Sequence, residues 1–269
     1  MHITPIRESA DSSFCHESLK EKSIFLRDYT TELYASGATT IRIEQNLQRI
    51  ADTWDVKADF SMMPTCIILN LWDKSEKHSY SITGKVPADK LNFHTVAYLS
   101  RLSWKIAERN IDIHIANRLF HYLTSRKRMN PWLVLFLVGC ANASFCELFG
   151  GDPISMLIVF IATVDGFFLK QRLPAMGVDF RIVIILAACL SAIISCSGFV
   201  FHLGSTPEIA LGTSVLYFVP GIPFCNAVSD LISGHYICCI SRFLHAVIIT
   251  FCLALGLCLA FLILNLQFL

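Results

Sequence analysis

Residues 131–149 are PWLVLFLVGCANASFCELF, an apolar run whose single charged side chain is Glu147. Four further apolar stretches follow it, at 153–169, 182–203, 207–225 and 243–264. A helix needs roughly 20 apolar residues to cross the hydrocarbon core of a bilayer. Each stretch approaches that length, so the sequence predicts about five transmembrane helices.

The distribution of charge divides the chain in two. Residues 1–128 contain 18 of the 22 Lys and Arg residues and 15 of the 21 Asp and Glu residues. A charge in hydrocarbon costs about 2.5–3.5 kcal/mol on insertion scales, so the sparsely charged remainder has a membrane composition. We therefore predict a membrane α-helical bundle over 129–269, preceded by a soluble N-terminal α+β domain. A wholly soluble chain of this length is too short to bury five such helices on all sides.

The N-terminal region has no apolar segment typical of a cleavable signal peptide. We expect a flexible leader over 1–18 and a cytoplasmic α+β domain over 19–128. Helical periodicity and turn residues predict its elements. They are a helix from Leu19 that ends at Ser36–Gly37–Ala38, a second helix from Thr39, two antiparallel strands within 57–83, and helices over 88–108 and 111–125.

Lys and Arg residues beside the apolar stretches predict the orientation, because cytoplasmic loops carry an excess of them. They lie before the first stretch, between the second and third, and between the fourth and fifth, where Arg242 stands. The connections 150–153 and 204–208 contain none. This pattern predicts a multi-pass membrane protein with a cytoplasmic N-terminus. With an odd number of spans, the C-terminus then lies on the opposite side of the membrane.

Cysteines and histidines do not indicate a metal or disulfide framework. The 11 cysteines form no C-x-x-C pair and lie mostly in apolar runs, where a free thiol behaves as a small hydrophobe. The nine histidines form no pair at a spacing of four. Neither a glycine-rich phosphate loop nor a G-x-S-x-G motif is present. We therefore expect no metal, no cofactor and no enzymatic activity.

The fourth apolar stretch contains Pro220–Gly221–Ile222–Pro223, which predicts a broken helix. Asn226 and Asp230 follow at a spacing of four, so they share one face of a resumed helix that Gly234 ends. A broken membrane helix exposes backbone groups at depth, and transporters use such breaks as substrate sites. Alternatively, the break ends the span and both polar residues cap a cytoplasmic loop.

Other polar residues of the membrane half are candidates for a transport pathway. Asp165 lies within the second stretch, where it either faces the bundle or pairs with Lys170 or Arg172. Glu147 and Asp152 flank Gly150–Gly151. They are either groups of the transport pathway or charges in a solvated loop. In the N-terminal domain, Arg42 and Glu44 lie on the second helix. Pro64–Thr65 falls within the first predicted strand, which implies an edge or a bulge.

These elements together resemble the threonine/serine exporter family, and specifically its N-terminal half. In the first domain the match rests on Ser36–Gly37–Ala38, Arg42, Glu44, and Pro64–Thr65 ahead of Ile67–Ile68. In the membrane half it rests on Phe149–Gly150–Gly151 and on P-G-I-P-F-x-N-A-x-x-D-L-x-x-G, from Pro220 to Gly234. The order holds from about residue 20 to 264. Cys66 replaces an expected Gly, and Phe224–Cys225 replaces the more usual Leu–Thr.

The resemblance implies that this chain is the larger subunit of a split, two-component exporter. Full-length members look like two five-span halves, so a small separate membrane protein would supply the second half. Split members are associated with dicarboxylates such as succinate, and fused members with threonine and serine. The implied function is export of small carboxylates across the inner membrane. The simplest test of the two-component form is whether the adjacent reading frame encodes a small membrane protein.

Two other functions stay open at this point. One is a membrane-tethered hydrolase formed by the N-terminal domain, and the other is a metabolite-sensing regulatory subunit. The expected partners are the lipid bilayer, the second membrane subunit and a small carboxylate, and homo-oligomers are compatible with the sequence. We expect no nucleic-acid partner.

Overall fold

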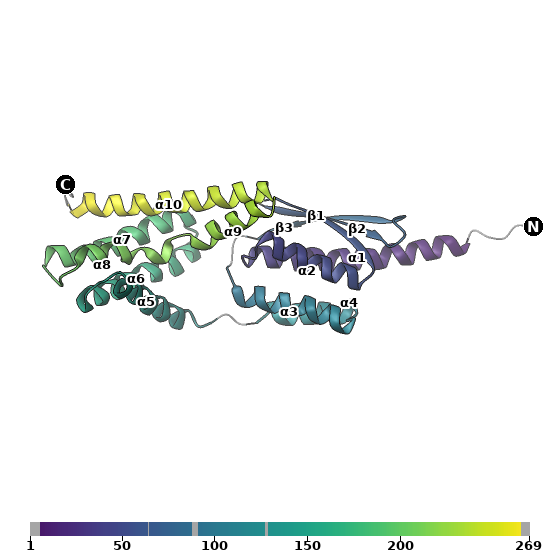
Figure 1. Ribbon diagram of the computed structural model, residues 1–269, viewed down its shortest axis with the longest axis horizontal. Coiled ribbons are helices and arrows are strands. Elements are labelled where there is room, and N and C mark those ends of the chain that lie inside the picture. Colours follow the sequence, from purple (N-terminus) through teal and green to yellow (C-terminus); the bar gives the residue numbers. More distant parts are fainter. Residues whose placement is uncertain (1–5, 64, 88–90, 127–128, 265–269) are drawn as a thin grey trace, which may run out of the picture. The chain divides into compact units, whose positions relative to one another are not determined.

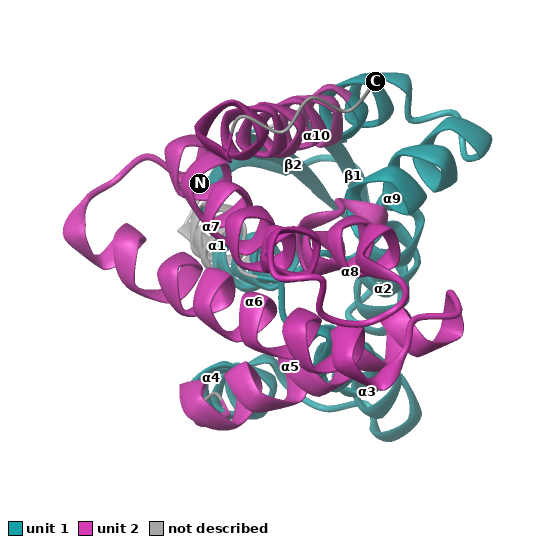
Figure 2. Cartoon of the chain, turned by 90° about the vertical axis from the view of Figure 1, so that its left-hand side faces the viewer, with its two compact units in different colours: residues 1–127, 222–243 teal, residues 128–221, 244–269 magenta. Residues whose placement is uncertain are grey.

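The computed structural model describes residues 6–63, 65–87, 91–126 and 129–264, with side chains from residue 18 onward. The chain divides into two compact units, which Figure 2 distinguishes by colour. The first unit comprises residues 1–127 and 222–243, and the second comprises 128–221 and 244–269. A segment expected in the membrane half, 222–243, is therefore part of the N-terminal unit.

The first unit combines helices with a small sheet (Figure 1). Its three strands form an antiparallel sheet in the order β1-β2-β3. Helices α1 and α2 pack against the sheet, and α3 and α4 pack on those helices. The elements before the second unit are α1 (Ile6–Ala35), α2 (Thr40–Thr53), β1 (Val56–Met62), β2 (Cys66–Asp73), β3 (Ser79–Lys85), α3 (Phe93–Arg109) and α4 (Ile113–Thr124).

This unit has its own hydrophobic core. Alternate residues of a strand point to one face, and Ile67, Leu69 and Leu71 of the central strand are fully buried. Tyr29 of α1 is also fully buried, and its hydroxyl donates a hydrogen bond to the Leu99 carbonyl at 2.8 Å. Burial raises the pKa of Tyr29. The N-terminal unit thus folds around a core like that of a soluble α+β domain.

Two expectations for this unit need correction. Helix α1 begins at Ile6 and covers most of the segment expected to be a flexible leader, since no Gly or Pro interrupts it before Ala35. The sheet has three strands where two were expected. The apolar run that was expected to form one strand forms two: β1 ends at Met62, and β2 begins at Cys66. Thr65 therefore lies between strands, and Pro64 lies outside the described residues.

Most of the second unit consists of long apolar helices. Asn130, Asp152 and Asp179 cap three of them, each accepting a hydrogen bond from the backbone N–H two residues further on. The elements are α5 (Pro131–Leu148), α6 (Pro153–Arg172), η1 (Leu173–Met176), α7 (Phe180–Val200), α8 (Pro207–Ser214), η2 (Leu216–Phe218) and the later part of α10 (Tyr236–Leu264).

Four of these helices are long and apolar enough to cross a membrane: 131–148, 153–176, 180–200 and 236–264. The pair 207–218 and 221–232 adds a fifth if it is counted as one broken span. Large apolar side chains on these helices are exposed, including Trp132, Leu157 and Leu262. Such surfaces require lipid or protein cover. The chain is therefore a multi-pass membrane protein.

Two of the expected spans differ from the structure at their ends. Helix α9 (Gly221–Ile232) begins inside the PGIP segment, so the chain breaks at Val219–Pro220 and resumes at once. Pro223 lies in the first turn of α9, where a missing backbone N–H costs nothing. Helix α10 begins at Tyr236 and not near 243, so it includes Arg242.

Candidate functional site: a junction of two motif segments

Two segments that are distant in sequence meet within the first unit. The Asn226 side-chain amide donates to the Gly37 carbonyl at 3.1 Å, and the Asp230 carboxylate accepts from the Thr40 backbone N–H at 3.3 Å. Gly37 belongs to the turn between α1 and α2, and Thr40 is the first residue of α2. The spacing of four places Asn226 and Asp230 on one side of α9, as predicted. We call the following residues the junction: Gly37, Ala38, Thr40, Asn226, Asp230 and Arg242.

The conformation of the turn explains why it requires glycine. Helix α1 ends at Ala35, and Gly37 adopts φ +92°, a left-handed conformation that side chains disfavour. A Cβ atom at Gly37 would also lie 2.5 Å from Cδ2 of Leu91. The turn directs the Gly37 and Ala38 carbonyls toward donors on α9 and α10.

Asp230 is fully buried at the N-terminus of α2. Thr39, the N-cap residue of α2, makes no side-chain capping hydrogen bond, and the first turn of α2 contains no acidic residue. The first backbone N–H groups of a helix lack partners and carry partial positive charge. The Asp230 carboxylate therefore supplies from α9 the negative group that the start of α2 lacks.

Arg242 of α10 completes the junction. Its Nη1 lies 3.2 Å from Oδ2 of Asp230, and its Nη2 donates to the Ala38 carbonyl at 2.9 Å. The guanidinium also lies over the Tyr34 ring, 5.0 Å from the centroid. Only 12% of the Arg242 side chain is exposed. A buried carboxylate needs such a counter-charge, because an unpaired buried charge is strongly destabilising.

Three polar atoms of the junction are buried without a hydrogen-bond partner among the described residues. They are Oδ2 of Asp230, Nη1 of Arg242 and Oγ1 of Thr40. The two charged atoms attract each other across 3.2 Å, but their angles do not make a hydrogen bond. Unsatisfied buried polar groups are rare in native proteins. The ion pair with Arg242 is therefore the main compensation for the buried Asp230 carboxylate.

Two further contacts border the junction. Nε2 of His235 lies 3.4 Å from a carboxylate oxygen of Glu44, and the Cys238 thiol donates to the Met62 carbonyl at 3.5 Å. Of the predicted N-terminal residues, Gly37 and Glu44 therefore lie at or beside the junction. Arg42 is exposed on α2, and the Thr65 carbonyl accepts a hydrogen bond from the Val86 backbone N–H, just outside the strands.

The predicted acids of the second unit are placed differently. Glu147 is exposed near the end of α5, and Asp165 is exposed on α6. Asp152 caps α6 and accepts hydrogen bonds from the hydroxyls of Ser155 and Thr206. These bonds, that of Ser155 first, lower the pKa of Asp152. Asp152 thus fastens the α5–α6 connection to the residues before α8.

A buried polar cluster in the second unit was not among the predicted sites. The Asn142 amide donates to Oγ1 of Thr163 at 2.6 Å and to the Thr213 carbonyl at 2.9 Å. The hydroxyls of Ser191 and Tyr217 lie 2.9 Å apart. The sequence gives no signal for this cluster, because uncharged polar residues within apolar runs do not indicate their distant partners.

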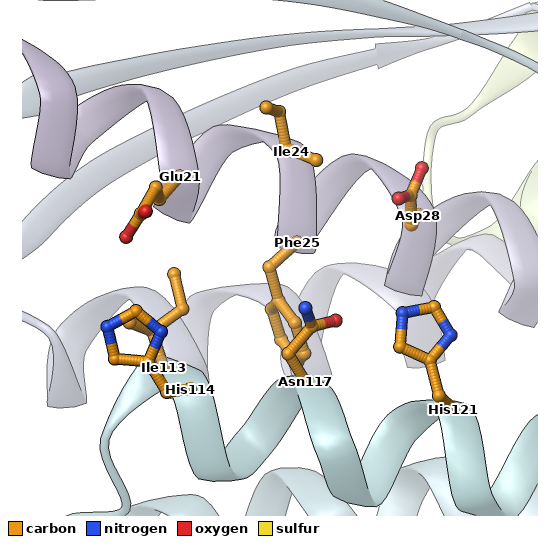
Figure 3. Close-up of a pocket in the computed structure, with 8 residues that line it drawn as sticks. All are labelled: Glu21, Ile24, Phe25, Asp28, Ile113, His114, Asn117 and His121. Carbon is orange, nitrogen blue, oxygen red and sulfur yellow. The ribbon is translucent and has the colours of Figure 1, made fainter.

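A small groove lies between α1 and α4 (Figure 3). Its volume is about 230 Å³. Figure 3 shows Glu21 and Asp28 on α1 at one side of the groove. His114, Asn117 and His121 lie on α4 at the other side. Asp28 already pairs with Arg27 at 2.7 Å. No group of three or more His, Cys, Asp or Glu residues suited to a metal ion was found among the described residues.

Comparison with known proteins identifies the family. A family model described as "Putative threonine/serine exporter" matches residues 28–264, which include both segments of the junction. The chain belongs to the threonine/serine exporter family. This result confirms the resemblance found in the sequence motifs.

Two curated relatives of this chain are each named "Probable succinate transporter subunit YjjP". The protein from Escherichia coli strain K12 is 29% identical over 173 residues, and that from Klebsiella aerogenes is 27% identical over 173 residues. Each alignment covers 63% of this chain and 66% of the relative, just under two thirds of its length. No solved structure matches the chain significantly.

Proposed function

We propose that this chain is one subunit of an inner-membrane exporter of small carboxylates. Membership of the exporter family supports the transport function, and the apolar helices support the location in a membrane. The relatives named as succinate transporter subunits favour a dicarboxylate substrate and a second subunit. Threonine and serine are the alternative substrates, given the family description.

The buried Asp230–Arg242 pair is the observation on which the role of this chain rests. The pair joins α9 and α10 to the start of α2, and α10 continues as one helix into the second unit. Helix α10 is also a candidate membrane span. A change of conformation at the junction would therefore act on the same helix that is proposed to cross the membrane. We propose that Asp230 and Arg242 couple the N-terminal unit to transport.

The proposed topology places the N-terminal unit in the cytoplasm and the C-terminus in the periplasm. Leu244–Leu264 of α10, the part beyond the junction, is long enough for a span of roughly 30 Å. Arg242 then lies at the cytoplasmic end of that span, in agreement with the excess of Lys and Arg in cytoplasmic segments. Reporter fusions at each terminus test this topology.

The groove between α1 and α4 supports a sensing role within the same transporter. It offers carboxylate, imidazole and amide groups over an apolar floor of Ile24, Phe25 and Ile113. Its lining contains no Ser or Cys nucleophile, so it offers little support for a hydrolase. His114→Ala with His121→Ala should change the substrate dependence of export if the groove senses a metabolite, and should leave it unchanged otherwise.

The function is tested by measuring efflux from cells. Cells would express this chain alone, with the membrane protein encoded by its adjacent reading frame, or that protein alone. After loading with labelled succinate, only cells with both proteins should export it rapidly. Labelled threonine provides the substrate control. Equal efflux in all three strains, for both substrates, would exclude the proposed exporter.

A further inference from the structure

Asp165 of α6 has no partner within the described chain. Its side chain is exposed, and it forms no hydrogen bond or ion pair with any described residue. The two nearby cations are engaged elsewhere. Nζ of Lys170 lies over the rings of Phe167 and Phe218, and the Arg172 guanidinium lies over Phe168. Neither of the two interpretations drawn from the sequence, a bundle-facing acid or a local ion pair, matches this placement.

The face of α6 that carries Asp165 is otherwise apolar and exposed. Ile154, Leu157 and Ile161 precede Asp165 at helical spacing, and they are 47%, 60% and 45% exposed. The opposite face packs inside the unit, where Val159, Ala162 and Thr163 are fully buried. Helix α6 therefore presents an uncovered apolar face with one carboxylate, which we call the Asp165 face (Ile154, Leu157, Ile161 and Asp165).

Asp165 lies deep in a candidate membrane span. It is seven residues before Arg172 and twelve after Pro153, so at a rise of about 1.5 Å per residue it is roughly 10 Å from Arg172. Ionisable groups in spans rarely face lipid, and they pair with other groups or line a polar cavity. Contact with lipid alone would therefore be unfavourable for the Asp165 carboxylate.

We propose that the Asp165 face binds a transmembrane helix of the second subunit, which presents a Lys or Arg side chain to Asp165. This inference rests on the proposed two-subunit exporter. A second copy of this chain is a poorer fit, because a symmetric contact through this face would oppose two Asp165 carboxylates. A different chain with a basic residue at this depth satisfies the carboxylate and covers Ile154, Leu157 and Ile161 at once.

Site-specific photo-crosslinking in intact membranes tests the interface. A photoreactive phenylalanine is placed at Leu157 or Ile161, or at Leu262 as a control, since Leu262 on α10 is 76% exposed. The full chain is co-expressed with the tagged membrane protein of the adjacent reading frame. We expect adducts with that protein from 157 and 161 but not from 262. Asp165→Lys should lower the adduct yield about tenfold, and Asp165→Asn should lower it less.

The other outcomes separate the interface from the function. Adducts at twice the mass of this chain would show a homodimer and overturn the inference. Adducts with the second protein from 262 alone would also overturn it, while the two-subunit exporter would stand. An unchanged yield in Asp165→Lys, with equal membrane levels, would exclude the ion pair. If no position yields an adduct and this chain exports succinate alone, the two-subunit function itself fails.

Discussion

The Asp230 carboxylate lies 3.2 Å from Nη1 of Arg242, and no part of the Asp230 residue is exposed. The two residues come from different helices, α9 and α10. Asp230 also binds the first backbone N–H of α2, and Arg242 binds the turn that precedes α2. Because neither charge is well hydrated, each depends on the other. The pair is therefore expected to determine both the stability of the first unit and its connection to the membrane helix.

Removal of one charge should destabilise the protein more than removal of both. Asp230→Leu or Arg242→Met alone leaves a buried unpaired charge, which costs about 3–5 kcal/mol. The double variant removes both charges and should recover much of this loss, without recovering export. Thermal unfolding of the detergent-solubilised full chain measures the three variants. Additive losses in the double variant would contradict the coupling of the two charges.

A side chain at Gly37 should destabilise the turn. Gly37→Ala introduces a Cβ atom at positive φ and against Leu91, and should cost about 1 kcal/mol or more. Gly177 provides the matched control, because it also has positive φ but a Cβ atom added there would meet no other atom within 4 Å. Gly37→Ala should lower the unfolding temperature more than Gly177→Ala. Equal losses would mean that Leu91 imposes no constraint.

The amide of Asn226 should matter through its donor group. Asn226→Ala removes a hydrogen bond to the Gly37 carbonyl, a loss of about 0.5–1.5 kcal/mol. Asn226→Asp replaces the donor with a carboxylate facing that carbonyl, and brings a second negative charge near Asp230. It should therefore destabilise the protein more than Asn226→Ala in the same unfolding assay. The reverse order would argue against the assigned hydrogen bond.

Asp152 should make the free energy of unfolding depend on pH in the acidic range. Hydrogen bonds from Ser155 and Thr206 lower its pKa in the folded state, so its contribution is present above the unfolded pKa of about 3.9. That contribution should be lost as the pH falls below about 4. Asp152→Asn should be less stable than the parent chain at pH 7 and should lose less stability on acidification. Parallel pH profiles for the two proteins would exclude this role.

Much of the fold follows from the sequence because local signals are strong. The apolar stretches locate the membrane helices, and Gly37 and Gly234 end helices with positive φ, as their positions predicted. Every cysteine whose side chain is described is a free thiol. The strand count was harder to predict, since the connection at 63–65 lies inside one continuous apolar run.

The junction was only half predictable. Spacing placed Asn226 and Asp230 on one helical face, but it does not identify a partner 190 residues away at Thr40. Arg242 was expected in a loop, because the apolar stretch begins after it. The helix starts earlier, at Tyr236, because this segment packs in the N-terminal unit, where Cys238 is buried. Long-range packing of this kind leaves no trace in local periodicity.

The initial rate of labelled succinate efflux from cells that express Asp230→Asn with the second membrane protein tests the account most directly. Asp59→Asn is the matched control, since Asp59 is exposed on β1. With equal amounts of protein in the membrane, we predict that Asp230→Asn lowers the rate about tenfold or more, equivalent to at least about 1.4 kcal/mol, and that Asp59→Asn leaves it unchanged. An unchanged rate in Asp230→Asn would contradict the proposed role of the Asp230–Arg242 pair.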